Sequence, residues 1–231
     1  MHFLVDLKRK VIFGWSAKCG CSHVKNLFFY LTNGTINNRL HKGNESHNLP
    51  QNIEEFSIFL FVRNPYKRVV SGFLDKYSNT GSFLKKWTLK LPLTFDNFVN
   101  ELVKSNFQII DRHHFTQQMS EKFDLLLQIK NKKQIQMQKI IIYDIENINY
   151  EHLEEIYQQK IPFEVLNFRG GHEYKYQEII DYPVYNLLTN DFKEKKPLTK
   201  CFYNENIKEK IDIFYKKDFD FFKSYDINYN I

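Results

Sequence analysis

The stretch FGWSAKCGCSHVKNLFF, Phe13 to Phe29, combines the end of an apolar run, a short polar segment and the start of an amphipathic segment. The apolar run starts at Val11 and predicts a buried strand over residues 11–15. The Gly and small polar residues that follow predict a tight loop, and the spacing of apolar residues from His23 to Leu31 predicts a helix. Because the first N–H groups of a helix have no acceptor inside it, such a junction is typical of phosphate sites.

A second junction of the same kind follows. EFSIFLFVR, Glu55 to Arg63, is an apolar run rich in aromatic and β-branched residues, and Asn-Pro stops it. It predicts a second strand, and Pro65 suits the first turn of the next helix.

The rest of the sequence predicts further elements. They are a strand at 139–145, a helix capped by Thr94 or Asp96, a helix after residue 148 and a helical C-terminal tail. Alternating strands and helices predict an α/β fold with a mostly parallel sheet covered on both faces, in one domain over 1–231.

Composition restricts the partner and the compartment. The chain has 231 residues, a formal net charge of +6 and 42% hydrophobic residues. This charge favours an anionic partner but does not distinguish nucleic acid, a nucleotide, a glycan or lipid head groups. Three cysteines do not suggest a disulfide framework, and no apolar run approaches the ~20 residues that span a bilayer. The basic cluster follows the short apolar N-terminal run, so we expect a cytoplasmic protein without a signal peptide or membrane span.

The first loop has the pattern K-x-G-x-S at Lys18, Gly20 and Ser22. It lacks the G-x-x-x-x-G-K-[ST] spacing of nucleoside triphosphatases and also lacks G-x-G-x-x-G. Backbone amides around Gly20 to His23 are placed to surround a terminal phosphate, to which Ser22 adds a hydroxyl and Lys18 a charge. On this short pattern alone, a glycine turn with a solvated lysine is an equal alternative.

The second segment strengthens the phosphate interpretation. FVRNPYKRVVSGFLDKY puts Arg63 at a strand end and Ser71 within the following helix. Both side chains meet a second phosphate if the helix packs beside the strand end, where open α/β sheets bind ligands.

KCGCSHVK and RNPYKRVVSGFLDKY together resemble the carbohydrate sulfotransferases that use 3′-phosphoadenylyl sulfate (PAPS), especially the Golgi group that acts on chondroitin, dermatan and related glycans. The resemblance implies a P-loop-like sulfotransferase fold. It assigns the 5′-phosphosulfate to Lys18, Cys19, Gly20, Cys21, Ser22 and His23, and the 3′-phosphate to Arg63 and Ser71. The family often has Thr-Asn-Trp or Thr-Ser-Trp where this chain has Ser22 to Val24, so the packing around the loop is left open, as is the natural acceptor.

The resemblance also implies the chemistry. Sulfuryl transfer needs charge stabilisation on the leaving phosphate, for which Lys18 is the candidate, and a base for the acceptor proton. DRHHFTQQ, Asp111 to Gln118, is similar to a family segment and aligns His113 with the family's histidine and Gln117 with its glutamine. His113 is the predicted base and His114 the second candidate, while a surface or hydrogen-bonded core histidine is the competing interpretation. No metal is expected.

Two rival functions are a P-loop-like nucleotide kinase and a non-catalytic basic module that binds nucleic acid or sulfated polymers. A kinase would need a Lys-Ser/Thr pair after a second glycine and an acidic pair for Mg²⁺, and this sequence lacks both. The binding module leaves the two ordered phosphate segments without explanation. We therefore expect a transferase with a carbohydrate or other hydroxyl acceptor, without nucleic acid as a partner. The oligomeric state and the type of hydroxyl acceptor stay open.

Overall fold

A computed structural model divides the chain into two compact units. Unit 1 comprises Met1–Arg63 and Gln118–Glu173, and unit 2 comprises Asn64–Gln117 and Tyr174–Ile231. The structure describes residues 1–36, 48–77, 93–105, 107, 110–121, 123, 124, 126, 128, 140–166, 178–192 and 194–231.

Unit 1 is built on a four-stranded sheet in the order β1-β2-β3-β4. The strands are β1 (His2–Asp6), β2 (Val11–Trp15), β3 (Ser57–Val62) and β4 (Ile140–Asp144). β1 pairs antiparallel with β2, whereas β2 pairs parallel with β3 and β3 parallel with β4. The three predicted strands are confirmed, and β1 is an addition. Parallel pairing places the carboxyl ends of β2, β3 and β4 at one edge of the sheet, where α/β proteins bind ligands.

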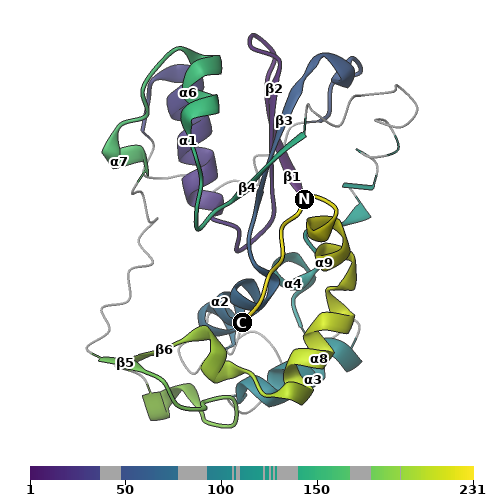
Figure 1. The fold of residues 1–231 in the computed structure, drawn as a ribbon, viewed down its shortest axis with the longest axis vertical. Coiled ribbons are helices and arrows are strands. Elements are labelled where there is room, and N and C mark those ends of the chain that lie inside the picture. Colours follow the sequence, from purple (N-terminus) through teal and green to yellow (C-terminus); the bar gives the residue numbers. More distant parts are fainter. Residues whose placement is uncertain are drawn as a thin grey trace. The chain divides into compact units, whose positions relative to one another are not determined.

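Helices lie beside this sheet (Figure 1). They are α1 (Cys21–Asn33), α6 (Glu151–Tyr157) and α7 (Phe163–Leu166), and a short 3-10 helix, η2 (Ile53–Glu55), precedes β3. Aromatic rings fill the space between α1 and the strands: the ring centroid of Phe13 lies 5.5 Å from that of Phe28 and 5.0 Å from that of Phe61. The predicted α/β fold, a mostly parallel sheet flanked by helices, is confirmed.

Unit 2 consists mainly of helices. They are α2 (Pro65–Lys76), α3 (Phe95–Lys104), α4 (Arg112–Phe115), α8 (Glu205–Phe214) and α9 (Lys216–Lys223). Two 3-10 helices, η4 (Thr189–Phe192) and η5 (Thr199–Phe202), and a short parallel pair, β5 (Glu178–Ile180) and β6 (Lys195–Pro197), complete it. Pro65 opens α2 as predicted, after Asn64, and Thr94 is the cap of α3 because its hydroxyl accepts from Asn97 N at 3.3 Å.

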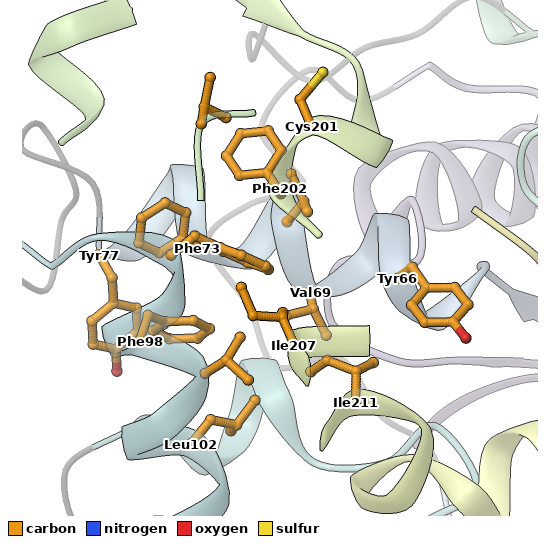
Figure 2. Packing of buried hydrophobic residues seen from close by; sticks show 14 of the residues in the cluster. Tyr66, Val69, Phe73, Tyr77, Phe98, Leu102, Cys201, Phe202, Ile207 and Ile211 are labelled. Atoms are coloured by element: carbon orange, nitrogen blue, oxygen red, sulfur yellow. The ribbon is translucent and has the colours of Figure 1, made fainter. Parts of the chain in front are cut away.

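One apolar cluster holds unit 2 together. Figure 2 shows side chains of α2, such as Phe73, gathered with side chains of α3, such as Phe98, and of α8, such as Ile207. The ring centroids of Phe73 and Phe98 lie 5.3 Å apart. Burial of aromatic rings contributes strongly to stability because each ring removes a large apolar surface from water. The helical spacing of apolar residues in the tail therefore reflects core packing, in two helices that meet at Tyr215.

Gly72 sets how closely α2 approaches α4. A Cβ atom at Gly72 would lie 2.5 Å from Cε1 of Phe115, whose side chain is 1% exposed. We expect Gly72→Ala to lower the free energy of unfolding by about 1–3 kcal/mol, because the ring must move within a packed core. Urea unfolding measures the change, with Lys67→Ala on the same helix as the control. Unchanged stability would show that the ring relaxes without cost.

Candidate active site

The loop between β2 and α1 forms a tight turn. Lys18 and Gly20 both have left-handed backbone angles, with φ of 67° and 66°, and Cys19 N donates to Ser16 O at 3.1 Å. Gly20 is the N-cap of α1, and the first hydrogen bond that closes the helix runs from Val24 N to Gly20 O at 2.9 Å. The amides of Cys21, Ser22 and His23 therefore precede the first intrahelical bond, as in loops that surround phosphate groups. The predicted strand, loop and helix junction is present, with the helix beginning at Cys21.

Side chains of the loop differ in burial. Cys19 is fully buried, whereas Lys18 and residues 20–23 are partly exposed. His23 Nε2 and the hydroxyl of Tyr150 form a hydrogen bond of 2.8 Å, so the ring is held on the β4 side of the loop. Gly20 lies beside Ile145, which also follows β4. A Cβ atom built at Gly20 would be 3.6 Å from the Ile145 side chain. The loop thus presents backbone amides and the Lys18 side chain, and its buried part packs on the sheet.

Arg63 follows β3 and reaches the same loop. Its Nη1 donates to the carbonyl oxygen of Lys18 at 3.3 Å, and its Nε pairs with Oε1 of Glu146 at 3.3 Å. The guanidinium therefore joins the segments that follow β2, β3 and β4. A guanidinium has five N–H donors in a planar fork, so these two contacts leave part of the fork for an anion. Glu146, which follows β4, is the carboxylate that contacts Arg63.

Ser71 and Arg68 lie on α2 in unit 2. Ser71 is partly exposed. The Arg68 side chain is buried, only 1% exposed, and its guanidinium donates to Thr116 O at 2.8 Å and His114 O at 3.1 Å. A buried cation is tolerated only with such partners, so Arg68 fixes the backbone that carries the histidines.

The two histidines occupy the short helix α4. Asp111 caps this helix by accepting from His114 N at 2.9 Å, and its carboxylate also contacts Nδ1 of His114. Burial alone would raise the pKa of the Asp111 carboxyl, but the hydrogen bonds from His114 outweigh it and hold that pKa below its usual value. His113 is exposed as a residue, yet partial burial of its ring and the charge of His114 lower the pKa of His113. The lowered pKa favours the neutral form of His113, which is the form that accepts a proton.

The predicted site residues divide between the units. Lys18 to His23 and Arg63 belong to unit 1, where a hydrogen bond joins Lys18 and Arg63, while Ser71 and His113 belong to unit 2. Sequence reasoning did not single out three polar residues that organise these segments. They are Arg68, Asp111 and Gln118. The sequence features that could have indicated them are an arginine on an otherwise apolar helix face for Arg68, an aspartate at a helix start for Asp111, and a glutamine after the histidines for Gln118.

Among the described residues, no group of three or more His, Cys, Asp or Glu side chains is arranged to hold a metal ion. Within the same ranges, no helix has the length and apolar character needed to cross a bilayer.

Comparison with known proteins matches residues 1–226 to a protein family described as the sulfotransferase family. No curated protein and no solved structure matches the chain. The family match spans both units and therefore includes the loop after β2, Arg63, α2 and the two histidines.

Proposed function

Since the chain belongs to the sulfotransferase family, we propose that it transfers the sulfuryl group of PAPS to a hydroxyl of a carbohydrate acceptor by in-line displacement. Membership of the family supports a transferase that moves a sulfuryl group. The cofactor and the type of acceptor are the finer parts of the proposal.

The observation that carries the proposal is the contact between the two predicted phosphate segments of unit 1. The amides at the start of α1 and the Lys18 ammonium suit one phosphate group, and the Arg63 fork suits another. Because Arg63 Nη1 donates to Lys18 O at 3.3 Å, both segments lie at one edge of the sheet. A nucleotide with phosphates on both its 3′ and 5′ positions would offer one anionic group to each segment. The residues therefore fit the cofactor that the resemblance implies.

Roles follow for the residues of this chain. PAPS supplies an activated sulfuryl group on a phosphate leaving group. Lys18 would stabilise the negative charge that develops on the bridging oxygen as its bond to sulfur breaks. That oxygen remains in the 5′-phosphate of 3′,5′-adenosine bisphosphate. His113 would take the proton of the acceptor hydroxyl as its oxygen bonds to sulfur. The amides of Gly20 to His23 would hold the phosphosulfate, with Cys19 in the turn beside them, and Arg63 and Ser71 would hold the 3′-phosphate.

Ligand-dependent stability tests the cofactor. We expect 3′,5′-adenosine bisphosphate to raise the Tm, because a ligand at about 100 times its Kd adds about 2.7 kcal/mol to folding. ATP with Mg²⁺, which the kinase alternative requires, and an oligonucleotide are expected to leave the Tm unchanged. A shift with ATP and Mg²⁺ alone would contradict the proposal.

Arg63→Ala tests the second phosphate site. We expect the variant to lose most of the Tm shift with bisphosphate, because the charged fork is removed. Arg9→Ala is the matched control: Arg9 also belongs to unit 1 and pairs with a carboxylate, Asp6, at 3.3 Å. It is expected to lower the baseline Tm and to keep the ligand-induced shift. An intact shift in Arg63→Ala would remove Arg63 from the site.

The acceptor is identified by transfer from radiolabelled PAPS. A panel of glycans is compared with a tyrosine peptide, a hydroxylated lipid and small alcohols. Label in a glycan supports the carbohydrate assignment, and label only in one of the other acceptors would contradict it while leaving sulfuryl transfer in place.

A further inference from the structure

Gln118 is a buried polar residue that the proposed reaction does not use. Its side chain is 1% exposed, and it belongs to unit 1 together with the loop after β2 and Arg63. A buried amide without partners would cost free energy, so its hydrogen bonds decide what this residue does.

The amide of Gln118 pairs with the backbone of Arg63. Its Oε1 accepts from Arg63 N at 2.9 Å, and its Nε2 donates to Arg63 O at 2.8 Å. The side chain thus satisfies both backbone groups of the residue that follows β3, as a neighbouring strand would. Because both bonds go to the backbone, the Arg63 guanidinium keeps its own contacts with Lys18 and Glu146.

The same amide holds the phosphate loop at its centre. Cys19 Sγ donates to Gln118 Oε1 at 2.9 Å, although the two residues are 99 positions apart. Cys19 stands between Lys18 and Gly20, the two residues with left-handed backbone angles. A left-handed conformation is unfavourable for a residue with a Cβ, such as Lys18, so the turn needs interactions that hold it.

We propose that Gln118 is a positioning residue that fixes the Lys18 to Gly20 turn relative to Arg63. One oxygen atom, Oε1, bonds to the loop and to the end of β3, so the separation of the two cation-bearing segments depends on this side chain. The inference rests on the proposed function for its consequence, the fit of a nucleotide with two phosphorylated ends. The link itself is a property of unit 1 and is testable without ligand.

Thiol reactivity tests the link. Cys19 and Cys201 are both buried, but Cys201 lies in unit 2, so it reports general loss of structure. In a Cys21→Ala background of the full chain, we expect Gln118→Met, similar in size but without hydrogen bonds, to raise the rate of Cys19 alkylation about tenfold. Mass spectrometry of the iodoacetamide-treated protein is expected to show an unchanged Cys201 rate.

Gln117→Met is the matched control. Gln117 Nε2 also donates to a backbone carbonyl, Phe214 O, at 2.7 Å, but within unit 2. This variant loses a comparable hydrogen bond and is expected to leave the Cys19 rate unchanged. Equal acceleration of Cys19 and Cys201 in Gln118→Met, or no acceleration of either, would overturn the proposal.

Binding of 3′,5′-adenosine bisphosphate tests the consequence. We expect Gln118→Met and Cys19→Ala each to raise the Kd about fivefold or more, and Cys19→Ser, which keeps a donor, to restore most of the affinity. Selective exposure of Cys19 with an unchanged Kd would overturn the positioning role. If the wild-type protein does not bind the bisphosphate at all, the proposed function fails, and the ratio of the Cys19 and Cys201 rates still decides whether Gln118 fixes the loop.

Discussion

Lys18→Ala is expected to lower kcat by about 10²–10³-fold, because the variant lacks the cation that stabilises the leaving phosphate. Its Kd for 3′,5′-adenosine bisphosphate is expected to rise less, since the amides at the start of α1 and Arg63 are retained. Lys18 has a φ of 67°, and Ala also carries a Cβ, so the substitution removes the charge without relieving the strained turn. Steady-state transfer from radiolabelled PAPS measures kcat, and calorimetry measures Kd.

Two further variants make this result specific. Lys18→Met keeps the length of the side chain and is expected to be as inactive as Lys18→Ala. Lys8→Ala removes the same charge from an exposed position of unit 1 and is expected to keep wild-type turnover. Wild-type turnover in Lys18→Ala would show that the leaving group is stabilised by other residues.

Local sequence signals predicted the two junctions that carry the proposed phosphate sites. An apolar run followed by a glycine or by Asn-Pro specifies a strand end and a helix start within a few residues, and both α1 and α2 begin where these signals stand. β1 was not predicted because the turn that joins it to β2 lacks such a local signal. Its hairpin with β2 turns through Leu7 to Lys10, where Lys10 has a φ of 54° without the Asn-Gly or Asp-Gly pair that marks such turns.

Residues that organise the site through distant contacts were not predictable in this way. Gln118 meets Cys19 across 99 positions, and Arg68 meets Thr116 across 48. No local pattern distinguishes such a glutamine or arginine from a solvated one, because its partners are chosen by the tertiary fold. The helical tail shows a second limit: its apolar spacing continues through Tyr215, where the chain ends one helix and begins another without a proline or glycine.

His113→Ala is expected to lower kcat by about 10²–10⁴-fold, the range for loss of a general base, with binding of the bisphosphate unchanged. His152→Ala, at an exposed position of unit 1, is the matched control and is expected to keep wild-type activity. Wild-type turnover in His113→Ala would remove this histidine from the mechanism.

The pH dependence of the wild-type enzyme follows from the same assignment. The base must be neutral to accept a proton, and burial and the charge of His114 lower the pKa of His113 below its usual value of 6.5. The value of kcat/KM is therefore expected to fall on the acid side with a midpoint below pH 6.5. A midpoint above pH 6.5 would contradict the assignment.

Asp111→Asn distinguishes the two histidines. The negative charge of Asp111 raises the pKa of His113, in opposition to the larger effects that lower it. If His113 is the base, removing this charge shifts the acid limb of the pH profile to lower pH and changes the plateau little. If His114 is the base, its activity instead depends directly on the Asp111 carboxylate, which contacts Nδ1 of His114 and orients the ring. A large loss of plateau activity in Asp111→Asn, matched by the same loss in His114→Ala, would therefore transfer the role of base to His114.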